Sequence, residues 1–137
     1  MTTRVIFFQV KEAKAKLSCL LEMATAHFAK KEPLLIFVED EKTALYVDDL
    51  LWKLPPTSFL PHAIVTEGST ELVAITHGKA NLTQAKIAFN LCSTPLLVEG
   101  PFRILYDFED LTSPSKKQLS ELRFDAYKRA RLPIEAR

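Results

Sequence analysis

The spacing of hydrophobic residues changes several times along the chain, and each change predicts a new element. Residues 5–10 and 34–38 are apolar, β-rich runs, and the second contains no polar residue, which is typical of a strand buried on both faces. Between them, residues 11–31 carry apolar side chains at helical spacing with lysines on the other side, so we expect an amphipathic helix. Strand, helix and strand in immediate succession favour parallel pairing.

A second helix is predicted directly after the buried strand. Asp40 occupies an N-cap position, and Glu41 lies in the first turn, where a carboxylate meets the positive end of the helix dipole. The residues at helical spacing that we expect to pack on the sheet are Ala44, Val47, Leu51 and Leu54. Pro55 and Pro56 then end the helix, because proline removes a backbone donor.

The middle of the chain predicts strands without a helix between them. Residues 63–65, 71–75 and 86–92 alternate or run apolar, and residues 78–83 contain the glycine, asparagine and threonine of a turn. Because no amphipathic run of helical length separates 71–75 from 86–92, we expect these two strands to form an antiparallel hairpin. The sheet would then be mixed but largely parallel.

The last third of the chain predicts one more strand and one more helix. Residues 93–100 are too short for more than a turn or one helical turn, and residues 102–108 are expected to form the strand. Ser113-Pro114 is a good helix start, and the helix should run to about Arg131. Its expected apolar side is made of Leu119, Leu122, Ala126 and Ala130. We therefore expect one α/β domain over residues 1–137, a Rossmann-like three-layer fold with helices flanking the sheet.

Two large aromatic residues lie outside the periodic runs. Trp52 and Phe59 flank the double proline among polar and turn residues. Either one alone is explained by capping the core of its own domain. Both together beside a rigid turn favour a partner-binding patch, because large aromatic side chains are preferred anchors of interfaces.

Composition excludes several classes of function. The net charge is +1, so the molecule has no overall field that would draw it to nucleic acid or to an anionic membrane. Cys19 and Cys92 lie in apolar surroundings and are interpreted as free thiols in a reducing compartment. Because the sequence shows neither a signal peptide nor a run of membrane-spanning length, we expect a cytoplasmic protein without membrane contact.

The residue types needed for cofactor chemistry are sparse. Gly68, Gly78 and Gly100 are too far apart for a phosphate-binding loop or a dinucleotide fingerprint. The three histidines, His27, His62 and His77, have no metal-binding spacing. We therefore expect no cofactor, no metal and no catalytic residue.

An alternative is a small α/β enzyme that uses nucleotide or metal. Glu39, Asp40 and Glu41 stand at the carboxyl end of a strand, where such enzymes place Mg²⁺, and His62 offers an acid–base group. The simpler interpretation is that the carboxylates meet the helix dipole and that His62 holds its loop by a hydrogen bond.

The C-terminal helix offers a second candidate surface. Its basic residues outnumber Glu121 and Asp125, and they are Lys116, Lys117, Arg123, Lys128, Arg129 and Arg131. The helix dipole accounts for part of this charge. A cationic surface beside Phe124 suits a nucleic-acid backbone or an acidic peptide end.

The motifs around Trp52 resemble those of a known family, the chi subunit of bacterial DNA polymerase III. The resemblance runs from about Leu34 to Phe59 and, less tightly, from Leu91 to Tyr127. The segments that carry it are Glu39-Asp40-Glu41-Lys42, Leu51-Trp52 and Ser58-Phe59-Leu60-Pro61-His62. It implies a non-catalytic accessory subunit of the clamp-loader complex, a monomer or heterodimer that meets nucleic acid only indirectly.

The resemblance also implies two binding surfaces. A psi-like clamp-loader subunit would contact Trp52, Phe59, Leu60 and Pro61. The acidic, phenylalanine-ended C-terminal tail of single-stranded DNA-binding protein would contact Lys117, Gln118, Arg123, Phe124 and Lys128. This chain departs from the family at Glu121 and Asp125, where basic side chains are expected, and like charge weakens binding of an acidic tail. The family also has a longer helix where residues 93–100 lie.

Overall fold

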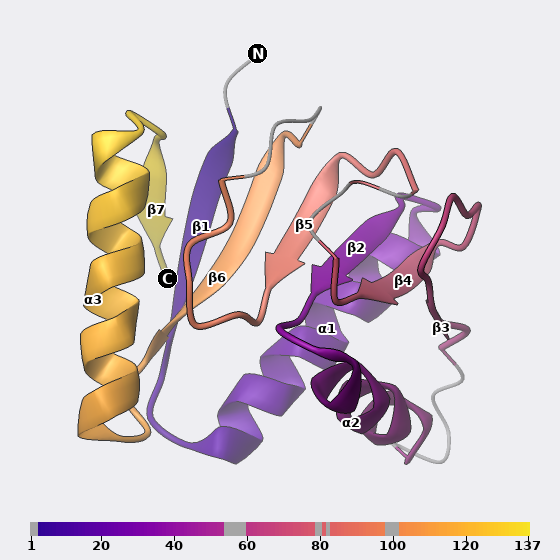
Figure 1. Cartoon of the computed structure of the whole chain (residues 1–137), viewed down its shortest axis with the longest axis horizontal. Coiled ribbons are helices and arrows are strands. Elements are labelled where there is room, and N and C mark those ends of the chain that lie inside the picture. The colour runs from indigo at the N-terminus through magenta and orange to yellow at the C-terminus, as the bar shows by residue number, and fades with distance from the viewer. Residues whose placement is uncertain (1–2, 54–59, 79–80, 82, 98–101) are drawn as a thin grey trace.

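Helices cover both faces of a seven-stranded sheet (Figure 1). The computed structural model describes residues 3–53, 60–78, 81, 83–97 and 102–137. Within these ranges the helices are α1 Ala13–Ala29, α2 Glu41–Lys53 and α3 Pro114–Arg129. The strands are β1 Arg4–Val10, β2 Leu34–Phe37, β3 Ala63–Ile64, β4 Val73–Thr76, β5 Ile87–Asn90, β6 Ile104–Asp110 and β7 Ile134–Ala136. The predicted α/β, Rossmann-like layout is confirmed.

All pairings in the described sheet are parallel, in the order β3-β4-β2-β5-β6-β1-β7. The predicted antiparallel hairpin is therefore wrong, and so is the mixed sheet. β2 lies between β4 and β5, with Leu34 opposite Val73 on one side and Ile87 on the other. A helix is not needed for this crossover. The chain must cross two strand spacings, about 10 Å, and return along a four-residue strand, about 13 Å, whereas the ten connecting residues 77–86 can span roughly 33 Å.

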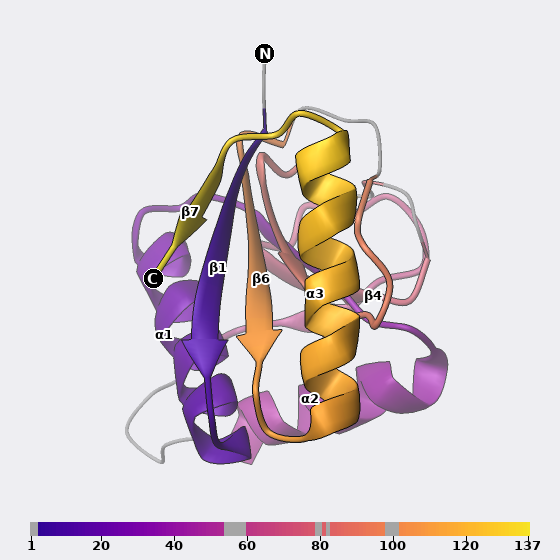
Figure 2. The ribbon, with the colours of Figure 1, turned by 90° about the vertical axis from the view of Figure 1, so that its left-hand side faces the viewer.

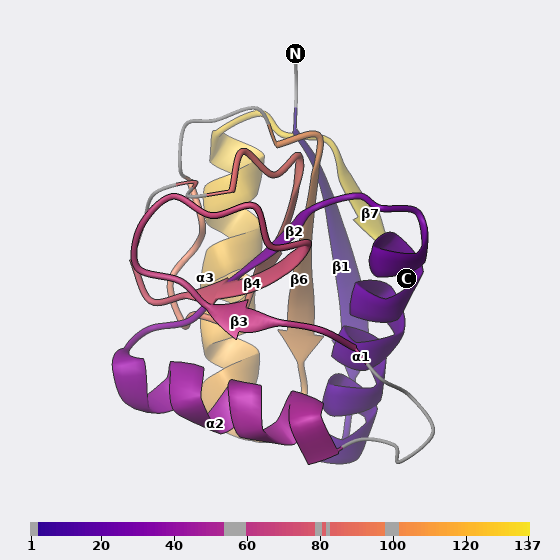
Figure 3. The same cartoon turned by 90° about the vertical axis from the view of Figure 1, so that its right-hand side faces the viewer.

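Alternate residues of the strands build one core on each face of the sheet. Leu34 and Ile36 belong to the core that α1 and α2 cover, whereas Leu35 and Phe37 belong to the core that includes Tyr127 of α3. Figures 2 and 3 show α3 on one side of the sheet and the other two helices on the opposite side. The four residues of β2 are at most 1% exposed, which confirms the prediction of a strand buried on both faces.

Helix α3 packs on the sheet with a side that differs from the predicted one. Its start is as expected, since the Ser113 hydroxyl accepts a hydrogen bond from the backbone N–H of Lys116 and proline follows. The residues buried against the sheet are Ser120, Arg123 and Tyr127. Leu119 and Leu122, expected on the buried side, are 38% and 56% exposed. A polar network at β6, described below, therefore sets the rotation of this helix.

Two features near the C-terminal half complete the sheet. The described part of the β5–β6 connection, residues 91–97, contains no helix, in agreement with the short crossover expected there. Strand β7 was not predicted, because Pro133 suggested the end of regular structure. The backbone N–H of Val5 donates to the carbonyl of Pro133, and Ile134 then pairs with Val5 in parallel.

Candidate functional site

The first candidate site lies at the carboxyl end of α2. The helix starts where predicted, because the Asp40 carboxylate accepts a hydrogen bond of 2.7 Å from the backbone N–H of Thr43. This bond lowers the pKa of Asp40 below its usual value. Of the four residues expected to pack on the sheet, Ala44, Val47 and Leu51 are buried, and Leu54 lies outside the described residues. The helix axis is thereby fixed, and its last turn carries Trp52 to the surface.

Trp52 is 51% exposed and rests on the ring of His62. The two ring centroids are 4.2 Å apart, and the ring planes are inclined by 38°. One side of the indole is therefore supported by the protein while a large part of it remains open to solvent. The contact with His62 restricts the orientation of the indole and leaves about half of the side chain accessible.

His62 is held in place from two directions. Its Nδ1 lies 2.7 Å from the carbonyl oxygen of Leu60, and its Nε2 lies 3.1 Å from the carbonyl oxygen of Asp48 on α2. Its side chain is fully buried, with the Asp48 carboxylate 3.2 Å away. The interpretation that His62 fixes its loop by hydrogen bonding is confirmed. The imidazole shows no surface from which it could act as an acid–base group.

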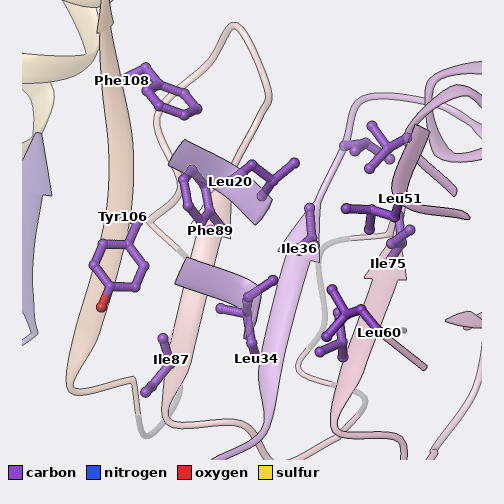
Figure 4. Close-up of a cluster of buried hydrophobic side chains, with 14 of the residues drawn as sticks. Leu20, Leu34, Ile36, Leu51, Leu60, Ile75, Ile87, Phe89, Tyr106 and Phe108 are labelled. Carbon is purple, nitrogen blue, oxygen red and sulfur yellow. The ribbon is translucent and has the colours of Figure 1, made fainter. Parts of the chain in front are cut away.

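The other residues expected at this surface differ in position. Leu60 is 3% exposed and belongs to the core on the α1–α2 side, where Figure 4 shows it with Leu51 and Ile75. It therefore does not extend the exposed apolar surface. Pro61 is half-buried. Phe59 lies outside the described residues.

Two exposed apolar residues on α2 were not identified from the sequence as candidate contact residues. Leu45 is 56% exposed and Tyr46 is 57% exposed. Leu45 stands seven residues before Trp52 and therefore shares its side of the helix, whereas Tyr46 points about 100° away from Leu45. The signal was available, because both residues are large and apolar at positions off the core-facing spacing. Leu45 and Trp52 together form what we call the α2 patch.

The second candidate site is a groove between α3 and the adjacent strands β1 and β6. Its cavity has a volume of about 430 Å³. The residues that line it are Phe7, Gln9, Glu109, Leu111, Lys117, Ser120, Glu121, Phe124 and Asp125. We call it the α3 groove. Two of the residues predicted for tail binding, Lys117 and Phe124, line this cavity.

The floor of the α3 groove is aromatic. Phe124 is 39% exposed, and its ring centroid lies 5.7 Å from that of the buried Phe7 on β1. Leu111 adds an aliphatic side chain to the lining. An apolar side chain of a partner could therefore be inserted against two rings, which is a favourable contact for a third aromatic residue.

The charged groups of the α3 groove are mostly acidic. Three carboxylates, those of Glu109, Glu121 and Asp125, face one ammonium, that of Lys117. Glu109 is partly engaged, because the side-chain amide of Gln9 donates to it over 2.6 Å. Gln118 and Lys128, also predicted for tail binding, are exposed on α3 outside this lining.

Arg123 occupies a different place from the one expected. It is 6% exposed, and its guanidinium is used inside the protein. Nε lies 3.2 Å from the Asp107 carboxylate, and the other nitrogens donate to the carbonyls of Ser93 and Phe108. Arg123 therefore positions α3 and cannot offer its charge to a partner without breaking these bonds.

Asp107 is the centre of the buried network beneath α3. Besides Arg123, it accepts hydrogen bonds from the Tyr127 hydroxyl over 2.7 Å and from the Asn90 side chain over 3.2 Å. Burial raises the pKa of Asp107, and the positive charge of Arg123 opposes that effect. Burial also raises the pKa of Tyr127, which keeps its hydroxyl a hydrogen-bond donor. Sequence spacing gave no sign of this network.

At the acidic strand end considered for an enzyme, the carboxylates of Glu39 and Asp40 accept hydrogen bonds from the protein backbone. The Glu39 carboxylate accepts from the backbone N–H of Ser93, and Asp40 caps α2. Within the described ranges, no group of three or more potential metal ligands comes together. A cavity of about 250 Å³ opens nearby at the carboxyl ends of β5 and β6, but Asp107 and Asp110 in it are paired with Arg123 and Lys16.

Comparison with known proteins points to one family. The model of the family described as "DNA polymerase III chi subunit, HolC" matches residues 1–135. No curated protein matches the chain.

Among the described residues, none of the helices has the length and apolar character needed to cross a bilayer. Cys19 is a free thiol, and burial raises its pKa to about 11.

Proposed function

The chain belongs to the family of DNA polymerase III chi subunits, and from this premise we propose that it bridges two partners during DNA replication. One partner is a psi-like subunit of the clamp loader, and the other is the acidic C-terminal tail of single-stranded DNA-binding protein. In this proposal the protein works in the cytoplasm by tethering and transforms no substrate. Joining the partners raises the effective concentration of one near the other.

The proposal rests mainly on the exposure of the Trp52 indole and on its contact with His62. The indole is half exposed, yet His62 supports it from one side, and the buried bonds of His62 hold that support in place. Covering the remaining indole surface would remove roughly 100 Å² from water, which corresponds to about 2.5 kcal/mol. We assign the psi-like contact to Trp52, together with Leu45 of the α2 patch, Pro61 and Phe59.

We assign the tail of single-stranded DNA-binding protein to the α3 groove. The terminal phenylalanine would stack on Phe124 and Phe7, and Lys117 offers the cation for the chain-terminal carboxylate. Lys128 lies one turn after Phe124 and is exposed, so it suits an upstream acidic residue of the tail. Gln118 supplies a further polar contact outside the cavity. Arg123 supports this surface from beneath.

A bridging assay tests the proposal. The psi-like subunit is immobilised, this protein is added, and the capture of single-stranded DNA-binding protein is measured. We expect Trp52→Ala to abolish loading of this protein, whereas Phe124→Ala or Lys117→Ala leaves loading intact and prevents capture of the second partner. Capture that survives both Phe124→Ala and Lys117→Ala would contradict the assignment of the tail to the α3 groove.

A further inference from the structure

Five neighbouring strands of the sheet each have a cation at their start or within three residues before it. The strands are β2, β5, β6, β1 and β7, in their order across the sheet, and the cations are Lys31, Lys86, Arg103, Arg4 and Arg131. Because these strands pair in parallel, their starts lie along one edge of the sheet. All five residues are exposed, and we call them the amino-edge row.

Backbone hydrogen bonds fix the order of the amino-edge row. The N–H of Arg103 donates to the carbonyl of Lys86 over 2.7 Å, and the N–H of Arg4 donates to the carbonyl of Arg103 over 2.8 Å. The carbonyl of Pro133, two residues after Arg131, accepts from the residue that follows Arg4. Adjacent strands are about 4.8 Å apart, so the row extends over about 19 Å. Figure 2 shows the starts of β1 and β6 and the last turn of α3 at this same end of the molecule.

The structure neutralises little of this positive charge. Among the described residues, Arg103 alone of the row has a carboxylate partner, that of Glu32 at 3.9 Å, and the same carboxylate also meets His27. Two further cations, Lys30 and Arg129, are exposed next to the row. A protein of net charge +1 therefore gathers positive charge at one edge, while the α3 groove holds mainly carboxylates.

Helix dipoles explain only part of the row. Lys31 and Arg131 follow the ends of α1 and α3, where a cation meets the negative end of the dipole. The other three cations stand at the starts of strands, and a sheet has only a small net dipole. Lys31 and Arg131 also have positive φ angles of 57° and 62°, a conformation in which glycine is the least strained residue. The chain thus places a cation at two positions where the backbone favours glycine.

An apolar cavity opens beside the amino-edge row. Its volume is about 430 Å³, and it is lined by Thr3, Leu96, Leu97, Phe102, Leu105, Ala130 and Leu132. Four of these lining residues are the immediate chain neighbours of Arg4, Arg103 or Arg131. Leu97 is 53% exposed, so part of the lining is open to a ligand. The described lining holds no charged side chain, in contrast to the row next to it.

From this arrangement we infer that the amino edge binds single-stranded nucleic acid directly: phosphates lie along the amino-edge row, and an unpaired base enters the cavity at Leu97. A nucleic acid has both a charge and a flat ring on every unit, whereas each residue of an acidic peptide has one or the other. In a single strand the bases are free to turn into an apolar surface. Three of the five cations are arginines, whose guanidinium groups bind phosphate oxygens in pairs. This contact is separate from the α2 patch and the α3 groove, and it goes beyond the proposed bridging role.

The test measures binding of a labelled oligothymidine to the wild-type protein by fluorescence anisotropy over a range of salt concentrations. An oligothymidine of about 16 nucleotides is long enough for one small binding domain. Each phosphate contact of a single strand contributes about −0.7 to the slope of log affinity against log salt, so five contacts give about −3.5. We expect binding at low salt with a slope of about −2 or steeper.

A triple variant of the row tests the assignment of the phosphates. Arg4→Gln, Arg103→Gln and Arg131→Gln together should weaken binding at low salt by about tenfold or more and make the slope shallower by about 2. Glutamine keeps much of the aliphatic stem, and the three residues are exposed, so the midpoint of thermal unfolding should stay close to that of the wild type.

The matched control removes the same charge from the opposite end of the strands. Lys11→Gln, Lys14→Gln and Lys42→Gln change exposed residues that follow the carboxyl ends of β1 and β2. This variant should bind oligothymidine within about threefold of the wild type, because exposed charges about 10 Å or more from the ligand are largely screened.

A strand without bases tests the cavity. The wild-type protein should bind an abasic strand of equal length about fivefold more weakly than oligothymidine, because the contact of the base with the cavity is lost. Leu97→Ser should reduce this difference, while the salt slope stays as in the wild type.

Three results would overturn the inference. One is the absence of oligothymidine binding at low salt, and another is an equal loss in the two triple variants, which would reduce the effect to net charge. The third is displacement of oligothymidine by polyglutamate at equal charge concentration together with equal binding of the abasic strand, which would assign the edge to an acidic protein segment. None of these results changes the expected capture of the psi-like subunit, so the proposed function is tested separately.

Discussion

The guanidinium of Arg123 on α3 and the carboxylate of Asp107 on β6 form a buried ion pair, with Nε 3.2 Å from Oδ1. The same guanidinium donates to the carbonyl of Ser93, which follows β5. One charge pair thus joins the helix, the sheet and the short β5–β6 connection. It explains why α3 buries a polar side and leaves two leucines exposed.

Breaking this pair from one side should destabilise the fold strongly. Arg123→Ala leaves the Asp107 carboxylate buried without its cation, and such changes cost about 3–5 kcal/mol. Denaturant unfolding measures the loss of free energy of unfolding. Arg129→Ala on the exposed side of the same helix should change that free energy by less than about 0.5 kcal/mol. A loss below about 1 kcal/mol for Arg123→Ala would contradict the central role of the pair.

The rotation of α3 predicts an unusual ranking of two substitutions. Leu122→Ala removes an exposed side chain and should change the free energy of unfolding by less than about 0.5 kcal/mol. Tyr127→Phe deletes only a hydroxyl but leaves Asp107 and the backbone N–H of Leu96 without that partner, so a loss of about 1–3 kcal/mol is expected. The opposite order in chemical denaturation would mean that the leucine faces the core.

The cap of α2 predicts a pH dependence. The pKa of Asp40 is lower in the folded protein than its ordinary value of 3.8, because the ionised carboxylate accepts the Thr43 N–H. Its contribution to stability is therefore fully present above pH 3.8 and is lost as the pH falls through the folded pKa. Thermal unfolding of the wild type and of Asp40→Ala should give different midpoints at neutral pH that converge in this acidic range. A difference that persists unchanged there would refute the cap.

The fluorescence of Trp52, the one tryptophan in the sequence, tests its contact with His62. His62→Ala removes the stacked imidazole from Trp52 and leaves the buried carbonyl of Leu60 without its donor. The emission of Trp52 should change in intensity or wavelength, and the free energy of unfolding should fall by about 1–3 kcal/mol. His77→Ala is the matched control, because that histidine follows β4 and is not in contact with the indole by any described ring interaction. An unchanged spectrum in His62→Ala would mean that the stack does not form in solution.

Local chemistry made the helices predictable. Asp40 and the Ser113-Pro114 pair signal helix starts through short-range hydrogen bonds, and the apolar run of residues 34–38 signals burial by composition alone. Strand order depends on partners far apart in sequence, so the position of β2 between β4 and β5 left no local trace. The rotation of α3 was also hidden, because apolar spacing indicated Leu119 and Leu122 while the bonds of Asp107 to Arg123 and Tyr127 determined the packing.

The same distinction applies to the candidate sites. Trp52 stood out because an aromatic residue beside a double proline has no place in a periodic run, and it is indeed exposed. Arg123 was grouped with the surface cations, since sequence alone does not show that a buried carboxylate lies opposite it. The α3 groove needed the parallel neighbours β1 and β6, which bring Gln9 and Glu109 together across the sheet.

The most direct test of the central claim measures the affinity of a psi-like subunit for the wild-type protein and for Trp52→Ala by isothermal titration calorimetry. Tyr46→Ala is the matched control, since Tyr46 is an equally exposed aromatic residue on another side of α2. We predict that Trp52→Ala weakens binding by about 30-fold or more, the effect of losing an interface hot spot of about 2 kcal/mol, while Tyr46→Ala stays within about threefold of the wild type. Equal affinities of Trp52→Ala and the wild type would contradict the claim that this indole anchors the partner.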